Sequence, residues 1–289
     1  MDHPSLDAFL DQCRASPMPG PVAVIFAEDP AEVGSTLRHN LAAGFATLLL
    51  LGVEIDDVPE ALLPRIHRIR YDIHADDAVP RAVNRLIAAA PGQWFYYCYN
   101  AEYLFYPFSE SRSVRELLAF HAEERRDAML CYVVDLYAGD LGRFPNAVSL
   151  EAALLDRTGY YAQSRPDPAN HNHPKERQLD FFGGLRWRFE EHVPPDRRRI
   201  DRIGLFRARP GLELLPGHRF NVEEYNTYAC PWHNNLTAAI CSFRTAKALK
   251  RNPGSTHAIA DFRWRGSTAF EWRAQQLMDL GLMEPGQWF

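Results

Sequence analysis

Residues 93–107, QWFYYCYNAEYLFYP, decide the fold class of this chain. The stretch begins with 94–98, a bulky run without charge that lies between a Pro-Gly pair and the polar residues 100–102. This pattern predicts a strand that is buried on both faces and whose carboxyl end emerges into a loop. Ligands bind at that end of the strands in open α/β sheets. A core strand with a tight turn and no chemistry is the alternative reading of the aromatic pattern.

Strands and helices alternate on both sides of this stretch. Apolar, β-rich runs predict strands at 22–26, 47–51, 66–71 and 128–137. Two capping-box patterns, at 29–32 and 113–116, predict helix starts, and a further helix is expected between residue 81 and the Pro-Gly pair at 91–92. Residues 236–249 show helical spacing of apolar side chains. The alternation predicts an α/β fold with an open, mostly parallel sheet and helices on both faces.

Length and composition are those of a globular α/β protein. A chain of 289 residues with 46% hydrophobic residues can bury a large core. The longest apolar run, 45–53, is too short to span a membrane, and the N-terminus does not resemble a signal peptide, so a cytoplasmic location is expected. Five widely spaced cysteines predict reduced thiols rather than a disulfide framework.

The charge distribution is asymmetric although the net charge is only −5. Residues 1–64 hold ten acids against two bases, whereas residues 165–209 hold eleven bases against seven acids. The arginine-rich stretch is either a solvated face or a counter-charge for phosphate. We expect no nucleic-acid partner, because the net charge is negative and no known binding module is recognisable.

A spaced pattern around Asn84 resembles that of family 2 glycosyltransferases with the GT-A fold. In that family an Arg and an Asn are followed by an Ala six residues after the Asn, a Gly eight after, and two metal-binding aspartates fifteen and seventeen after. Counted from Asn84, these positions are Ala90, Gly92, Tyr99 and Ala101. The frame matches, but both carboxylates of the Asp-x-Asp motif are replaced.

The resemblance implies a GT-A-like sheet and a nucleotide-sugar donor. Residues 1–140 would form the nucleotide-sugar-binding α/β half, and residues 141–289 an irregular acceptor lobe and C-terminal helices of the same domain. Donor contacts are expected from Glu28, Asp56, Arg81, Asn84, Asn100 and Glu102, with Arg186 and Arg188 as cations for the diphosphate. Because the aspartates are missing, a divalent metal (Mn²⁺ or Mg²⁺) is not required, and His233 is the one candidate metal ligand that the resemblance suggests.

Candidates for the acceptor side lie in the arginine-rich stretch. An inverting transferase needs a carboxylate base, for which Asp180, Glu190 and Glu191 are the candidates. Trp187 follows a double glycine at 183–184 and offers a flat face for a sugar, although a hairpin with a core tryptophan would give the same pattern.

Two functions follow from these features. The first is transfer of a sugar from a nucleotide-sugar donor to a carbohydrate or other acceptor. The alternative is a non-catalytic relative that binds a sugar or a partner with the same fold, as loss of both carboxylates would predict.

Overall fold

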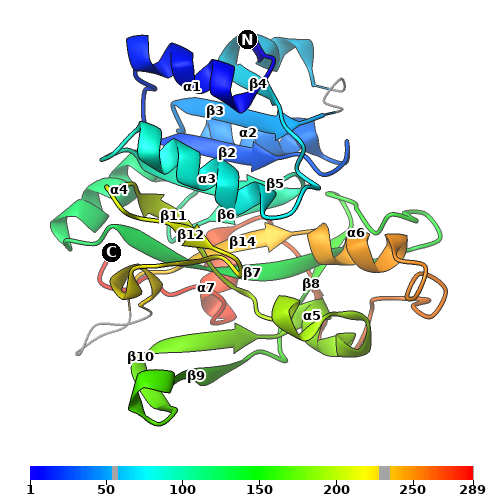
Figure 1. The fold of residues 1–289 in the computed structure, drawn as a ribbon. Coiled ribbons are helices and arrows are strands. Elements are labelled where there is room, and N and C mark those ends of the chain that lie inside the picture. The colour runs from blue at the N-terminus through cyan, green and yellow to red at the C-terminus, as the bar shows by residue number, and fades with distance from the viewer. Residues whose placement is uncertain (54–57, 228–234, 289) are drawn as a thin grey trace. The chain divides into compact units, whose positions relative to one another are not determined.

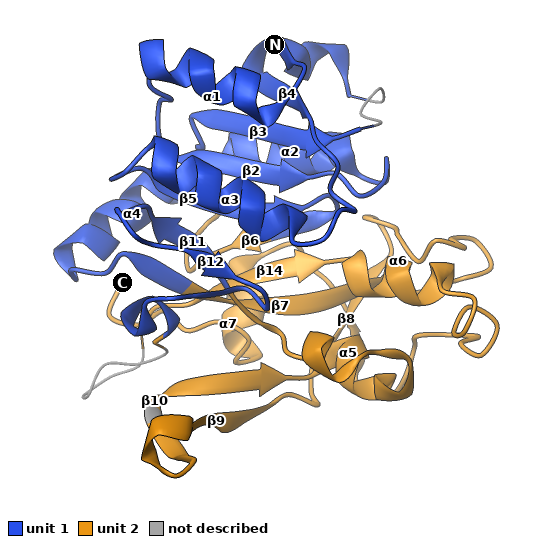
Figure 2. Ribbon diagram, viewed as in Figure 1, with its two compact units in different colours: residues 1–103, 111–129, 203–226 blue, residues 104–110, 130–202, 227–289 orange. Residues whose placement is uncertain are grey.

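The computed structural model describes residues 1–53, 58–227 and 235–288, and these form an α/β structure (Figure 1). The chain divides into two compact units, each built from segments distant in sequence (Figure 2). Unit 1 contains residues 1–103, 111–129 and 203–226, and unit 2 contains residues 104–110, 130–202 and 227–289. In this division the chain enters each unit three times.

Unit 1 consists mainly of a sheet with strand order β1-β4-β3-β2-β5-β11. Its strands are β1 (Asp2–His3), β2 (Val22–Phe26), β3 (Thr47–Gly52), β4 (Ile66–Arg70), β5 (Trp94–Tyr99), β11 (Asp201–Arg207), β12 (Leu214–Leu215) and β13 (Arg219–Phe220). Its helices are α1 (Leu6–Ala15), α2 (Val33–Ala43), α3 (Ala78–Ala89) and α4 (Val114–Glu123), with 3-10 turns η1 (Glu60–Arg65) and η5 (Glu223–Asn226). β12 and β13 form a separate antiparallel pair.

The predicted central strand is confirmed. β5 pairs in parallel with β2 and antiparallel with β11, and only Trp94 at its start is partly exposed. The neighbouring strands β2 and β3 are buried along their whole length, as expected for parallel strands covered on both faces. Helices α1 and α3 lie on one face of this sheet and α2 lies on the other (Figure 1).

Unit 2 contains a smaller sheet and a hairpin. Its elements are β7 (Ala128–Ala138), β8 (Ala153–Asp156), β9 (Tyr161–Asp167), η2 (Pro168–Asn170), β10 (His173–Phe182), α5 (Gly184–Arg188), η3 (Glu190–His192), η4 (Pro195–Arg197), β14 (Ala238–Ser242), α6 (Arg244–Arg251), β15 (Ser267–Ala269) and α7 (Ala274–Asp279). The short strand β6 (Glu102–Phe105), like β7 and β11, has residues in both units. β7 pairs in parallel with β14 and antiparallel with β8, while β9 and β10 form the hairpin.

Two predictions of local structure differ from the structure. α2 does not use the predicted capping box, because Glu32 adopts a left-handed conformation (φ 57°) and makes no side-chain cap. The helix expected over 236–249 is strand β14 followed by helix α6, since its first apolar residues pair with β7. The second capping box, at Ser113 and Glu116, is confirmed.

Two further expectations can be compared with the structure. No helix among the described residues is long and apolar enough to cross a membrane. Four of the five cysteines, Cys13, Cys98, Cys131 and Cys241, are free thiols.

We expect acid to lower the stability of unit 1 because of the buried side chain of His121. The ring is fully buried against Trp94, neither ring nitrogen has a hydrogen-bond partner among the described residues, and burial lowers its pKa to about 3. The unfolded chain takes up this proton below the ordinary pKa of 6.5, but the folded chain does not. Stability therefore falls between pH 6.5 and pH 3, by up to about 1.4 kcal/mol per pH unit.

The substitution His121→Phe keeps a ring of similar size and removes the titrating group, so we expect a shallower loss of stability over this range. Urea unfolding at several pH values measures the slope. Phe in place of the exposed His74 is the control for loss of a surface histidine. An unchanged slope in His121→Phe would contradict the prediction.

Candidate functional site

The turn after β5 contains Tyr99 and Ala101, the two positions compared above with an Asp-x-Asp motif, and hydrogen bonds to side chains hold this turn together. Ala101 adopts a left-handed conformation (φ 60°), and its N–H donates to Thr36 Oγ1 at 2.9 Å. The buried Glu102 carboxylate accepts from the Tyr99 N–H at 2.9 Å. The turn is thus a rigid connection between β5 and β6.

Asn100 fixes the loop that follows β2. Its Oδ1 accepts from the Glu28 N–H at 2.9 Å, and its Nδ2 donates to Asp29 Oδ1 and to the Ala31 carbonyl, both at 2.8 Å. The amide is fully buried. Glu28 and Asn100 therefore lie together, joined by bonds that set the loop conformation.

Asn84 is also bonded inside unit 1. Its amide donates to the Leu214 carbonyl at 3.0 Å and accepts from the Leu214 N–H at 2.6 Å, which is the pairing of a neighbouring strand residue. Arg81, one turn earlier on α3, is exposed and interacts with the Tyr71 hydroxyl. Of these two predicted donor contacts, Arg81 is exposed at the surface, whereas the Asn84 amide is bonded to Leu214.

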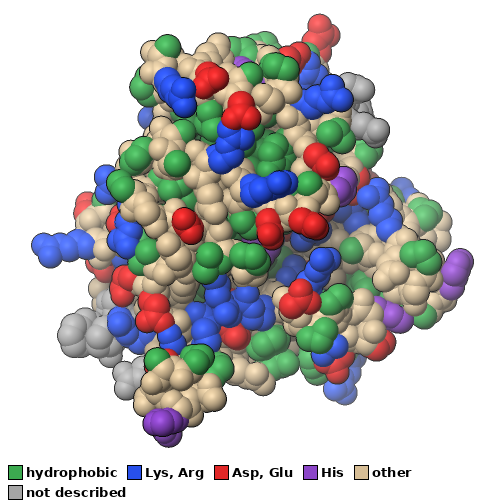
Figure 3. All heavy atoms as spheres, in the orientation of Figure 1, with side chains coloured by type: hydrophobic (Ala, Val, Ile, Leu, Met, Phe, Trp, Pro, Cys, Tyr) green, Lys and Arg blue, Asp and Glu red, His purple; other side chains and the backbone are tan. Residues whose placement is uncertain are grey.

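Two predicted residues, Asp56 and His233, lie outside the described residues. Within the described ranges, no group of three or more His, Cys, Asp or Glu side chains is arranged to hold a metal ion. On the face seen in Figure 3, basic and acidic side chains are interspersed rather than gathered into one broad patch.

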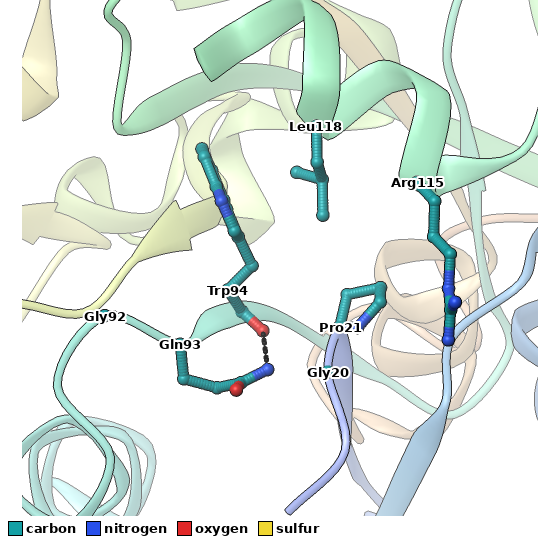
Figure 4. A pocket seen from close by; sticks show the side chains of 7 residues that line it. All are labelled: Gly20, Pro21, Gly92, Gln93, Trp94, Arg115 and Leu118. Atoms are coloured by element: carbon teal, nitrogen blue, oxygen red, sulfur yellow. Dashed lines mark hydrogen bonds between the residues drawn. The ribbon is translucent and has the colours of Figure 1, made fainter.

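A shallow pocket in unit 1 lies at the amino-terminal ends of β2 and β5, opposite the carboxyl ends at which the sequence predicts ligands. Figure 4 shows its lining side chains around the starts of β2 and β5 and the first turns of α4. These residues are Gly20, Pro21, Gly92, Gln93, Trp94, Arg115 and Leu118. None of them is a predicted contact, because the sequence argument places ligands at the carboxyl ends of the strands.

Unit 2 contains a buried polar cluster centred on Asp156. Its carboxylate accepts from the Tyr137 hydroxyl at 2.5 Å, from Trp264 Nε1 at 2.7 Å and from the Arg188 guanidinium at 3.1 Å. Arg188 also donates to the Phe262 carbonyl at 2.6 Å and lies over the Trp264 ring. The predicted phosphate-binding role of Arg188 is not supported by this position, because its charge is neutralised inside the unit.

Asp135 on β7 is another buried carboxylate of unit 2, and its surroundings differ from those of Asp156. Arg186 approaches it at 3.7 Å, while also donating to Thr245 and to the Arg199 carbonyl. Neither Asp135 oxygen has a hydrogen-bond partner of normal geometry among the described residues. Burial raises the pKa of Asp135. The Arg186 charge opposes this, as do the nearby Thr245 hydroxyl and Arg186 N–H, and the charge of Asp156 adds to it.

Tyr160 lies beside the two carboxylates. Its hydroxyl is buried without a hydrogen-bond partner among the described residues, and burial, followed by the charges of Asp156 and Asp135, raises its pKa. Asp135, which is paired with Arg186 at 3.7 Å, and the Tyr160 hydroxyl are thus two neighbouring buried groups without a hydrogen bond of normal geometry among the described residues, and such groups are enriched at functional sites.

The double glycine at 183–184 passes between these groups. A Cβ at Gly184 would lie 2.9 Å from an Asp135 oxygen, and one at Gly183 would lie 2.2 Å from the Tyr160 ring. Both glycines have positive φ angles, 154° and 62°. The close backbone approach expected from the sequence is observed, and its neighbours are the unsatisfied pair.

The predicted acceptor-side residues surround this region without forming a shared site. Asp180 pairs with Arg165 at 3.1 Å and with Arg199 at 3.8 Å. Glu190 pairs with Arg198, and Glu191 lies 3.8 Å from His192. Trp187 on α5 is 40% exposed, so it is not a core tryptophan.

Sequence reasoning missed Asp135. A signal was present, since one acid interrupts the otherwise apolar and aromatic strand β7, and charged residues are almost never fully buried without a reason.

Together these features define an α/β protein with a mostly parallel, helix-flanked sheet in unit 1 and a buried acid and hydroxyl pair in unit 2. Comparison of the chain with models of known protein families gave no match, and comparison with curated proteins likewise gave none.

Asn84 gives a direct test of these placements. Asn84→Leu removes both side-chain bonds to Leu214 and leaves the backbone N–H and carbonyl of Leu214 unpaired. We therefore expect the free energy of unfolding to fall by about 1–3 kcal/mol. Asn84→Asp keeps an acceptor for the Leu214 N–H and should lose less. Urea unfolding measures both variants. A stable Asn84→Leu protein that binds nucleotide-sugars poorly would instead place Asn84 in a ligand site.

Proposed function

We propose that this chain is a GT-A-like glycosyltransferase that transfers a sugar from a nucleotide-sugar donor to a hydroxyl acceptor. In this proposal Asp135 takes the role of the acceptor base, in place of Asp180, Glu190 and Glu191. The observation that carries it is the fully buried Asp135 carboxylate, which has Arg186 at 3.7 Å but no hydrogen bond of normal geometry among the described residues, and whose pKa is raised by burial. The GT-A resemblance of the sequence around Asn84 supplies the donor class.

The chemistry of Asp135 suits a general base. A carboxylate with an ordinary pKa is a weak proton acceptor, and burial strengthens it by disfavouring the charged form. Asp156 is a poor candidate although it is equally buried, because three donors already bind its oxygens. Asp135 is enclosed by Tyr160 and the 183–184 backbone, so proton transfer from an acceptor requires one of them to move.

We further propose that transfer does not require a divalent metal. Tyr99 and Ala101 carry no carboxylate, and Glu102 is bonded to the Tyr99 amide. Arg186 and Arg188 are bound to buried carboxylates, so Arg81 is the predicted donor contact whose charge is available to a diphosphate. The four free cysteines support a reducing, cytoplasmic location as part of the same proposal.

The second candidate is a non-catalytic sugar- or partner-binding protein. The specific observation in its favour is that Asn84, Asn100 and Glu102, which correspond to donor contacts, all bond to the protein's own backbone. Such side chains maintain loops whether or not a donor binds. The two candidates differ in whether a nucleotide is released from a nucleotide-sugar.

Nucleoside diphosphate release from a panel of UDP-, GDP- and dTDP-sugars tests the proposed function. We expect release, with water or added sugars as acceptor, at equal rates in chelator and in manganese. Asp135→Asn should reduce it by about 10²–10⁴-fold, the usual contribution of a general base. Glu190→Gln, which removes an exposed carboxylate, is the matched control and should keep the wild-type rate. Binding without release would favour the non-catalytic candidate, and a manganese requirement would contradict the metal-independent proposal.

The pH dependence of stability shows whether Asp135→Asn loses activity because it lacks the base or because its fold is disturbed. Because the folded pKa of Asp135 is raised, the folded state holds its proton to higher pH than the unfolded state, and wild-type stability falls as pH rises above the ordinary value. The Asn variant lacks this penalty. We therefore expect its stability relative to wild type to increase with pH from about pH 4 upward, measured by thermal unfolding. A variant that is less stable at every pH would indicate a structural ion pair with Arg186.

A further inference from the structure

Unit 2 presents two large aromatic side chains to solvent on either side of one short segment. Trp187 on α5 is 40% exposed and Tyr161 on β9 is 43% exposed. The Trp187 ring packs against Gly159. Tyr161 follows Gly159 by two residues, so the Cα atoms of residues 159 and 161 are about 7 Å apart at most. Large exposed aromatic side chains next to neighbouring stretches of backbone are candidates for a binding surface.

Both rings are held in place from behind. A Cβ at Gly159 would lie 3.0 Å from the Trp187 ring and 3.6 Å from the Trp264 ring, so the small residue at 159 seats Trp187. Tyr161 stacks on Phe182 across the hairpin, with ring centroids 5.2 Å apart and an angle of 18°. A preformed ring loses little conformational freedom when a ligand binds to it.

The neighbouring side chains are polar and planar. Gln163 is exposed and shares a strand face with Tyr161, because alternate residues of a strand point to the same side. Arg165 continues this face and is paired with Asp180, which is partly exposed and opposite Gln163 in the register. Amide, guanidinium and carboxylate groups next to an aromatic ring can bind adjacent hydroxyl groups while the ring covers the apolar face of a sugar.

The pattern is not that of a protein-binding surface, which would present a contiguous apolar centre. Among the exposed residues that adjoin Gly159 and Tyr161 in sequence, Arg157, Thr158, Gln163 and Ser164 are polar and Ala162 is small. We propose that Trp187 and Tyr161, with Gln163 and Asp180, form a carbohydrate-binding surface that takes an oligosaccharide. The inference rests on the proposed function only in identifying this oligosaccharide as the acceptor.

A glycan array that spans neutral hexoses, pentoses, amino sugars and uronic acids, probed with the full-length protein and no nucleotide-sugar, tests the inference. We expect binding to at least one class of oligosaccharide. Trp187→Ala and Tyr161→Ala should each weaken it by about three- to tenfold, the usual contribution of one aromatic contact. Calorimetry with the best-bound soluble oligosaccharide measures the change.

Leu215→Ala is the matched control, because Leu215 is also 40% exposed but lies on β12 of unit 1. Its affinity should equal that of wild type. Trp187→Phe should retain part of the affinity, which distinguishes a lost stacking contact from a misfolded surface. Absence of binding to every glycan, or equal affinity in both aromatic variants and wild type, would overturn the inference. Glycan binding without nucleotide release would leave it standing while the transferase function fails.

Discussion

The pairing of β5 on both of its edges is the constraint on which unit 1 depends. β2 adds in parallel along 95–99 and β11 adds antiparallel beside 94–96, so much of the backbone of an aromatic, charge-free strand is hydrogen-bonded without water. Once that strand is buried, its carboxyl end must emerge at the turn 99–102. The loop after β2 then reaches this turn and is fixed to it by Asn100.

Side-chain amides and carboxylates act as backbone substitutes throughout unit 1. Asn84 pairs with Leu214 as a strand residue would, Asn100 satisfies three groups of one loop, and Glu102 accepts an amide of its own turn. A polar residue at a matching position is therefore ambiguous, because the hydrogen bonds that could hold a ligand can equally hold a loop. For this reason nucleotide release, rather than the position of these side chains, tests whether a nucleotide-sugar donor binds.

Asp156 and Asp135, two of the buried aspartates of unit 2, show how environment separates residues of the same type. Asp156 receives bonds from a tyrosine, an arginine and a tryptophan, and so stabilises the packing of β8 with its neighbours. Asp135 has one guanidinium at 3.7 Å and no good hydrogen bond among the described residues. An unsatisfied buried charge lowers stability, and a protein retains such a group most readily where chemistry requires it.

The sequence by itself determined the α/β class, the buried strand at 94–98, most strand positions and the capping box at Ser113, because these depend on local periodicity and neighbouring side chains. It did not determine that residues 238–242 form a strand, since an apolar run becomes a strand when a parallel partner such as β7 is present. Only the tertiary structure decided which polar side chains are already bonded: Arg188 meets Asp156 and Asn84 meets Leu214 across long stretches of chain. Asp135 emerged in the same way, because the absence of partners is a property of three-dimensional surroundings and not of sequence spacing.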